Sequence, residues 1–165
     1  MGCVIREYRP ADAPHLRQCV VALQEIERGI DPRLRPGETM ADAYCARIHA
    51  RCREADGHVL VAELDGAVVG FVAVLTREMF TELYDPPGSY AYVTDLVVLA
   101  PYRHRGIGRA LLERAEALAL AAGAPELRIG VLARNVAARR LYLAADFAPH
   151  VEILTKRWTD QRPAS

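Results

Sequence analysis

The stretch Tyr102-Arg-His-Arg-Gly-Ile-Gly-Arg-Ala-Leu-Leu112 decides how the rest of the chain is interpreted. It follows the apolar, β-branched run 92–100 and precedes a segment with helical periodicity, so the sequence predicts a strand, a turn and a helix start. Gly106 and Gly108 carry no side chains that would keep an anion from the backbone, and the N–H groups of residues 104–109 can converge on a phosphate. Three arginines add positive charge around this point: Arg103, Arg105 and Arg109.

The spacing argues against two other phosphate-binding motifs. A nucleoside triphosphate loop requires Lys and then Ser or Thr after its last glycine, whereas Gly108 is followed by Arg109 and Ala110. The dinucleotide fingerprint requires a third small residue where this chain has Leu111. The remaining pattern, Arg-x-x-Gly-x-Gly over 103–108, resembles the acyl-CoA pyrophosphate loop of the GNAT superfamily of N-acetyltransferases.

Length and charge indicate one soluble domain. The 165 residues suit a single domain, expected over residues 3–159 with a flexible C-terminal tail at 160–165. The 21 basic and 21 acidic residues cancel, so no global field favours nucleic acid. We expect a cytoplasmic protein with no membrane segment, because no stretch approaches the ~18–20 apolar residues of a span and no signal peptide is recognisable. The four cysteines form no Cys-x-x-Cys pair, so we expect no metal site.

The hydrophobic pattern predicts an α/β fold with a mixed sheet. Asp65-Gly66 separates two apolar, β-branched runs and is a strong hairpin signal. Asp12 is expected to cap the first helix, and Thr39-x-x-Asp42 to cap the second. The expected strands are 4–9, 58–64, 67–75, 91–99, 126–132 and 147–158, the expected helices are 12–28, 39–52, 108–122 and 136–144, and 76–90 is expected to be a loop.

A second motif supports the family resemblance. Residues 135–147 resemble the GNAT element Asn-x-x-Ala-x-x-Leu-Tyr-x-x-x-Gly-Phe, with Asp146 in place of the glycine. Asn135 can cap the helix, and Tyr142 lies seven residues on, nearly two full turns, hence on the same face. Ala138 between them leaves room for a thin ligand. Alternatively, Asn135 is only a cap and Tyr142 only a core aromatic.

The resemblance implies a GNAT fold with acetyl-CoA as co-substrate and no metal. It implies a mostly antiparallel sheet of six to seven strands, about four helices on both faces, and splayed central parallel strands. The pantetheine arm would run along the free backbone of Leu96, Val97 and Val98, side chains that could equally be core. The remaining cofactor contacts would come from Arg103, His104, Arg105, Gly106, Ile107, Gly108, Arg109, Asn135, Ala138 and Tyr142.

The reaction implied by the family needs a general base. An ammonium with a pKa of ~10.4 is only about one part in 10³ neutral at pH 7, and only the neutral amine attacks a thioester. Asp95 is the first candidate, although an acid in an apolar strand can also be a hydrogen-bonded structural group. Some members carry Glu where this chain has Thr94, and strand alternation predicts opposite faces for Thr94 and Asp95. More distant candidates are Glu25, Glu63 and His150.

Tyr142 matches the family's general acid, which protonates the leaving CoA sulfur. Because a phenol is a weaker acid than a thiol, Tyr142 could instead only hydrogen-bond and position the sulfur.

The acceptor is expected between residues 28–44 and 76–92. The second segment could receive a cationic amine or could be a solvated loop, since it contains Glu78, Phe80, Glu82, Tyr84, Asp85, Tyr90 and Tyr92. Arg33 and Arg35 could instead favour an anionic acceptor. A small amine, an amino acid, an antibiotic and a protein amino group all stay open.

The resemblance therefore predicts an N-acetyltransferase acting on a primary amine by direct attack in a ternary complex. Two alternatives stay open: an inactive acyl-CoA-binding sensor or scaffold of the same fold, and a different phosphate-binding protein such as a nucleotide-binding domain. A homodimer is expected because the family often dimerises.

Overall fold

The Asp65-Gly66 turn organises the first half of the sheet. Both residues have positive φ, 50° and 80°, as a type I′ hairpin turn requires. They join β2 (His58–Leu64) to β3 (Ala67–Met79) as antiparallel neighbours, as the sequence predicts.

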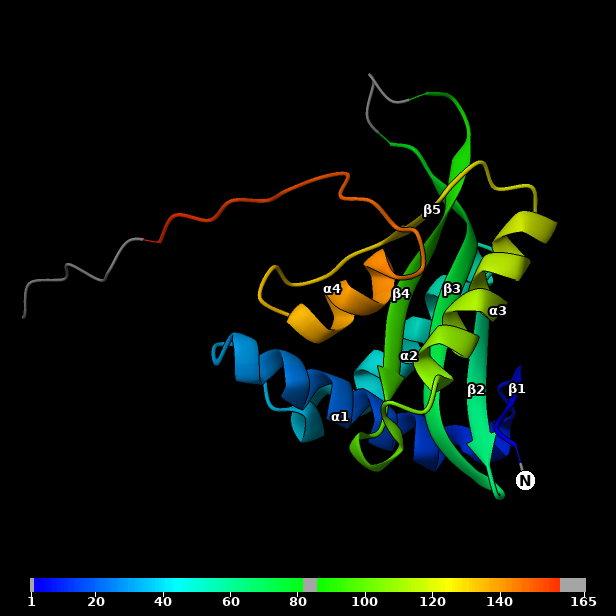
Figure 1. The fold of residues 1–165 in the computed structure, drawn as a ribbon, viewed down its shortest axis with the longest axis vertical. Coiled ribbons are helices and arrows are strands. Elements are labelled where there is room, and N and C mark those ends of the chain that lie inside the picture. Colours follow the sequence, from blue (N-terminus) through cyan, green and yellow to red (C-terminus); the bar gives the residue numbers. More distant parts are fainter. Residues whose placement is uncertain (1, 82–85, 158–165) are drawn as a thin grey trace, which may run out of the picture.

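The computed structural model describes residues 2–81 and 86–157. Within these ranges the five strands form one sheet in the order β1-β2-β3-β4-β5, in which only the β4–β5 pair is parallel (Figure 1). The other elements are β1 (Val4–Glu7), β4 (Ser89–Val98), β5 (Leu127–Ile129), α1 (Ala13–Ile30), α2 (Gly37–Glu54), α3 (Ile107–Ala121) and α4 (Val136–Leu143), with short 3₁₀ turns at Pro10–Asp12 and Ala100–Tyr102.

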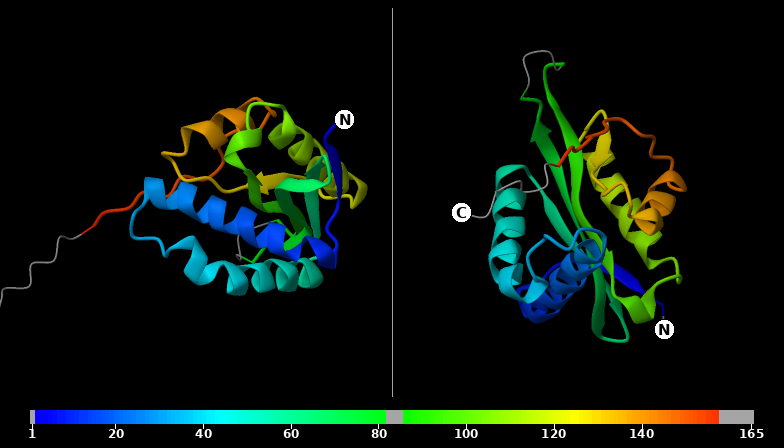
Figure 2. Two further views of the ribbon diagram at one scale, coloured as in Figure 1. Left: turned by 90° about the horizontal axis from the view of Figure 1, so that it is seen from below. Right: turned by 90° about the vertical axis from the view of Figure 1, so that its left-hand side faces the viewer.

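The sheet separates two hydrophobic cores. Helices α1 and α2 cover one face and α3 and α4 cover the other (Figure 2). Leu16, Val20 and Ile48 pack against one face with Phe71, which is fully buried. Leu111, Leu112 and Ala115 of α3 pack against the other, with Val72 and Val93. The side chains on both faces of the sheet are therefore buried under helices.

Strands β4 and β5 part after three residue pairs. Their ladder runs from Ala91–Leu127 to Val93–Ile129, after which β4 continues to Val98 without β5. The expected splay of the central parallel strands is confirmed. It leaves the β5-facing edge of residues 94–98 unpaired by the sheet.

A bulge lies at this splay. The β3–β4 register passes from Ala73–Asp95 to Val74–Val93, so Thr94 is an extra residue on β4. Val93 accordingly packs under α3 and α4, whereas Val97 packs under α1 and α2, although strict alternation would place both on one face. The alternation expected for Thr94 and Asp95 is wrong for this reason: the Thr94 hydroxyl donates to Asp95 at 2.6 Å.

Several predicted boundaries differ from the structure. Helix α2 begins at Gly37, before Thr39, because the Gly37 N–H is held by the Glu25 carboxylate at 2.7 Å, a tertiary contact that no local motif records. Strand β3 extends to Met79 and β4 begins at Ser89, which narrows the expected loop.

The family resemblance predicts six to seven strands, whereas the described residues form five. The run expected as a strand over 147–158 has no regular secondary structure up to residue 157, since no described strand pairs with it. Trp158, the expected tail at 160–165, and Glu82, Tyr84 and Asp85 of the expected acceptor loop lie outside the described residues. No helix in the described ranges is long and apolar enough to cross a membrane.

Candidate active site

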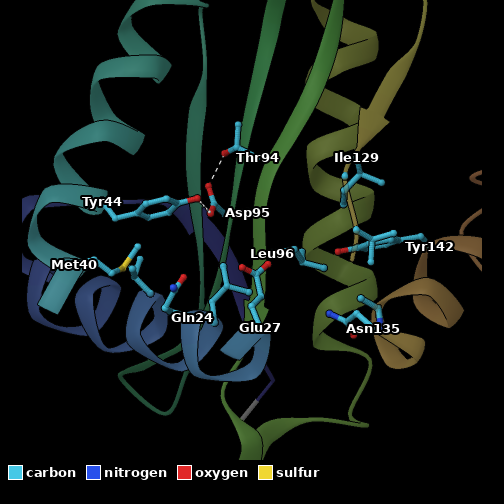
Figure 3. A pocket seen from close by; sticks show the side chains of 15 residues that line it. Gln24, Glu27, Met40, Tyr44, Thr94, Asp95, Leu96, Ile129, Asn135 and Tyr142 are labelled. Atoms are coloured by element: carbon cyan, nitrogen blue, oxygen red, sulfur yellow. Dashed lines mark hydrogen bonds between the residues drawn. The ribbon is translucent and has the colours of Figure 1, made fainter. Parts of the chain in front are cut away.

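A cavity of about 90 Å³ opens where β4 and β5 part (Figure 3). Its walls come from α1 and α2 on one face of the sheet, from β4 and the end of β5, and from α4 on the other face. The lining residues are Val20, Leu23, Gln24, Glu27, Met40, Tyr44, Thr94, Asp95, Leu96, Ile129, Gly130, Val131, Asn135, Ala138 and Tyr142.

The glycine turn lies between the end of β4 and the start of α3. Gly106 has φ 78° and caps α3, and His104 also has positive φ, 60°. As the first residues of the helix, Ile107, Gly108 and Arg109 have no intrahelical carbonyl acceptor, so their free N–H groups form the positive, anion-attracting end of the helix dipole. A Cβ built on Gly106 would meet no atom within 4 Å, so the space beside this turn is open.

The three arginines of the glycine turn form contacts within the protein, two with backbone carbonyls and one with a carboxylate. Arg103 Nε donates to the Val98 carbonyl at 2.9 Å, and Arg105 donates to the Pro101 carbonyl at 3.1 Å. Arg109 pairs with Glu113 at 2.9 Å. All three side chains are exposed, so they add positive charge around the turn.

The three predicted β4 residues divide between the two faces. Leu96 lines the cavity, and Val98 packs against the α3 side. Val97 is 4% exposed and belongs to the core beneath α1 and α2, so its side chain cannot contact a ligand in the splay. Only its backbone is a candidate cofactor contact, which agrees with the backbone contact expected from the sequence.

Helix α4 presents the second motif to the cavity. Asn135 does cap α4, since its side-chain oxygen accepts the Ala138 N–H at 3.2 Å, and Asn135 also lines the cavity. Tyr142 is 8% exposed, packs near Phe147 and directs its hydroxyl into the same space (Figure 3). The structure therefore brings Asn135, Ala138 and Tyr142 together on one wall.

The surroundings of Tyr142 keep its phenol protonated. Burial raises the pKa of Tyr142 to about 12, and the negative charges of Glu27 and Asp95 add to the shift. A hydroxyl with such a pKa is a hydrogen-bond donor throughout the physiological range.

Asp95 is almost fully enclosed, and each of its carboxylate oxygens accepts one hydrogen bond. It is 5% exposed, and its two oxygens accept from the Tyr44 hydroxyl at 2.8 Å and from the Thr94 hydroxyl at 2.6 Å (Figure 3). Burial raises the pKa of Asp95, while these two hydrogen bonds and the charges of Arg51 and Arg47 oppose the rise.

Glu27 is a second carboxylate in the cavity, and sequence reasoning missed it. It is half-buried, and burial, with the negative charge of Asp95, raises its pKa. One signal was available. Val20, Leu23 and Glu27 follow the i, i+3, i+7 spacing of one helix face, so an acid continues the apolar stripe of α1.

The residues expected to receive the acceptor are engaged elsewhere. Glu78 pairs with Arg51 at 3.0 Å, and Phe80 and Tyr90 flank the Arg128 guanidinium at 5.0 and 4.3 Å. Arg33 pairs with Asp31. Two residues of the expected segment 28–44, Met40 and Tyr44, do line the cavity, and residues 20–27 of α1 supply the adjoining wall.

The three more distant base candidates lie outside the cavity. Glu25 caps α2 through the Gly37 N–H, and Glu63 pairs with Arg6 at 2.6 Å. His150 is exposed on the C-terminal segment. Among the residues that the structure describes, no group of three or more His, Cys, Asp or Glu could hold a metal ion.

Comparison with known proteins agrees with this geometry. The family model of the acetyltransferase (GNAT) family matches residues 20–147. An uncharacterised N-acetyltransferase of Archaeoglobus fulgidus is 31% identical over 140 residues, which cover 85% of this chain and 91% of that protein.

Solved structures share the fold at lower identity. A GCN5-related N-acetyltransferase from Ralstonia eutropha is 20% identical with a TM-score of 0.73, and the match covers 94% of this chain and 99% of that one. The aminoglycoside acetyltransferase AAC(6′)-Iy, bound to the bisubstrate analogue CoA-S-monomethyl-acetylneamine, is 17% identical with a TM-score of 0.70, covering 96% and 99%.

Proposed function

This chain belongs to the GNAT family of acetyltransferases, and from that premise we propose that it transfers the acetyl group of acetyl-CoA to a primary amine by direct attack in a ternary complex. The single observation that carries the proposal is the cavity at the β4–β5 splay. It places the Tyr142 hydroxyl and two carboxylates, Asp95 and Glu27, beside the unpaired edge of β4. The glycine turn at the start of α3 lies at the end of the same strand.

The residues present fit acetyl-CoA as the donor. A pyrophosphate can bind at the start of α3, where the first N–H groups of the helix are free and exposed arginines lie nearby. The open space beside Gly106 leaves room for it. The backbone of residues 94–97, which β5 leaves unpaired, suits the amide groups of a pantetheine arm in the manner of an added strand, whereas the Val98 carbonyl accepts from Arg103 Nε at 2.9 Å. Asn135 and the small Ala138 leave the α4 wall open toward Tyr142. The CoA analogue bound to AAC(6′)-Iy supports the same donor.

Tyr142 is proposed to act on the departing sulfur. The amine nitrogen forms a bond to the thioester carbon, and the C–S bond breaks with its electron pair going to sulfur. A protonated phenol directed into the cavity can donate to that sulfur. It either transfers its proton or stabilises the thiolate by hydrogen bonding.

A thiol-release assay with acetyl-CoA tests the proposal. The panel covers a simple alkylamine, an arylalkylamine, a polyamine, an amino acid, an aminoglycoside and a peptide with a free amino terminus. Transfer to at least one amine, with the N-acetyl product seen by mass spectrometry, is the expected result. In parallel, acetyl-CoA should raise Tm more than ATP or NAD does. Stabilisation by acetyl-CoA with no transfer to any amine would identify the sensor or scaffold function instead.

We also infer that the protein forms a homodimer. The C-terminal segment exposes Val151, Ile153 and Leu154, and α4 exposes Val136 and Leu143. Large exposed apolar side chains of this kind are typical of an interaction surface. Because both surfaces occur on every copy, two copies related by a twofold axis can cover one another.

A further inference from the structure

The cavity holds two carboxylates, and they differ in how free they are to react. We propose that Glu27, rather than Asp95, receives the ammonium group of the acceptor and removes its proton, and that Asp95 is a positioning residue which holds Tyr44 and Thr94. This inference rests on the proposed acetyl transfer and assigns the base and the acceptor class of that site.

Asp95 is poorly placed to take a proton from a substrate. Each of its oxygens already accepts a hydroxyl, from Tyr44 on α2 and from Thr94 on the same strand, at 2.8 and 2.6 Å. Only 5% of the residue is exposed, which leaves little surface for an incoming ammonium. The bulge at Thr94 also turns Asp95 toward the α1 and α2 face, opposite the face of Leu96. Its contacts fix the wall of the cavity.

Glu27 has the opposite properties. Among the described residues, its carboxylate makes no hydrogen bond or ion pair, although it is half-buried. In Figure 3 the carboxylate lies between Asp95 and the Tyr142 hydroxyl. An unpartnered carboxylate in a partly apolar cavity gains most from a cationic partner.

The proton transfer balances without any further reagent. The Glu27 carboxylate binds the R–NH₃⁺ group and takes one proton, giving R–NH₂ and a neutral carboxylic acid. The amine then attacks the thioester carbon, and the sulfur leaves with the bonding pair. The nitrogen loses its second proton as the amide forms, while the sulfur gains one, so the net products are the acetamide, the free thiol and one proton held by Glu27.

The neighbours of Glu27 suit this role. Asp95 from β4 adds negative charge, while Tyr44 from α2 and Tyr142 from α4 present neutral hydroxyls. Arg47 and Arg51 of α2 act on Asp95. The remaining walls around Glu27 combine the apolar side chains of Val20, Leu23 and Met40 with the neutral amides of Gln24 and Asn135. The cavity therefore fits the end of a slim, unbranched primary alkylammonium.

Steady-state kinetics of E27Q, D95N and the control E116Q test the assignment with ethylamine and trifluoroethylamine as acceptors. Glu116 is exposed on α3, far from the cavity in sequence, and controls for loss of a helix carboxylate. We expect E27Q to lower kcat/KM for ethylamine by about 10²-fold and to remove the acidic limb of the pH profile. At about pH 8 trifluoroethylamine is already neutral, so its rate should fall less than about threefold in E27Q. D95N should keep the acidic limb.

The possible failures are distinguishable. An acidic limb that survives in E27Q and disappears in D95N would overturn the assignment and leave acetyl transfer intact. Equal losses with both amines in E27Q would assign Glu27 a structural role. If the wild type acetylates other amines of the panel but not ethylamine, the acceptor class is wrong. If it acetylates none, the proposed function itself fails.

Discussion

At the scale of single residues, two carboxylates share one cavity but meet different surroundings. The structure satisfies Asp95 with two hydroxyls, and it leaves Glu27 without a partner among the described residues. Two carboxylates with such different surroundings can have different roles in one reaction. An unpartnered, half-buried acid also costs stability, which can be measured without any substrate.

The substitution E27Q should stabilise the protein in a pH-dependent manner. The folded-state pKa of Glu27 is raised above its unfolded value by burial and by Asp95, so ionisation opposes folding. Below about pH 4 the wild-type carboxyl is protonated in both states, and the two proteins should melt alike. As pH rises through the folded pKa, the wild type alone takes up the cost, and E27Q should melt roughly 1–3 °C higher at pH 8. Equal Tm values across this range would mean that Glu27 is solvated or paired.

Tyr142→Phe tests the acid at the sulfur. Loss of the hydroxyl removes a donor but keeps the ring that packs near Phe147, so folding and acetyl-CoA binding should persist. We expect kcat to fall about 10²-fold and the acetyl-CoA-induced rise in Tm to stay within 1 °C of the wild type. Tyr102→Phe, on the turn after β4, is the matched control. An unchanged kcat in Tyr142→Phe would exclude a role at the sulfur.

At the scale of elements, the start of α3 depends on a left-handed residue. Gly106→Ala and Gly66→Ala form a matched pair, because the two glycines have φ of 78° and 80° and neither Cβ would meet an atom within 4 Å. Each should cost about 1–2 kcal/mol of stability from conformation alone. Only Gly106→Ala should also weaken acetyl-CoA binding, by about tenfold or more, because its methyl group enters the space beside the α3 N–H groups. Isothermal titration calorimetry at matched folded fractions checks this, and equal affinities in both variants would contradict the cofactor site.

The close packing of α1 against α2 at Gly37 bears on the proposed acceptor side of the cavity. A Cβ on Gly37 would lie 2.8 Å from the Val21 carbonyl oxygen and 3.0 Å from its Cα, so Gly37→Ala must push the helices apart. We expect a loss of about 1–3 kcal/mol and a raised KM for the acceptor, because Glu27 and Tyr44 lie on the two separated helices. Gly29→Ala on α1 meets no atom within 4 Å and should instead stabilise by about 0.5–1 kcal/mol. Thermal melts of both variants test this prediction. If Gly37→Ala and Gly29→Ala changed Tm in the same direction, the close contact between Gly37 and Val21 would not determine how α1 and α2 pack.

Local chemistry explains which elements could be predicted. Asp65-Gly66 encodes its own turn, and Asn135 its own cap, so the β2–β3 hairpin and the start of α4 follow from neighbouring residues. The bulge at Thr94 and the α2 start at Gly37 depend on partners far along the chain, Ala73 and Glu25, which no local pattern names. Glu27 was missed for the same reason. Its place in the cavity follows from how α1 crosses the splay, although its position on the apolar stripe of α1 was visible.

At the scale of the whole molecule, the sheet divides the proposed donor and acceptor sides. The start of α3 and the motif of α4 lie with the core on one face, and α1 and α2 bring Glu27 and Tyr44 from the other (Figures 1 and 2). Residues from both sides line one cavity where β4 and β5 part. The family motifs lie on the donor side, which is why the sequence predicts the cofactor site and leaves the acceptor open.

The exposed apolar side chains of the C-terminal segment 148–157, which contacts the end of α1 through the Arg157–Asp31 ion pair at 3.6 Å, test the inferred homodimer. Ile153 and Leu154 are 87% and 85% exposed, which is costly for side chains of this size unless a second copy covers them. We expect a wild-type dimer in sedimentation velocity and a shift toward monomer in Ile153→Asp, since a buried unpaired carboxylate opposes association. Leu120→Asp changes a residue that is 68% exposed on α3 and should leave the dimer intact. Both variants should keep the wild-type Tm within about 2 °C at low protein concentration, because neither side chain is packed within its own copy. A wild type that stays monomeric at millimolar concentration would show that these side chains serve no contact between copies.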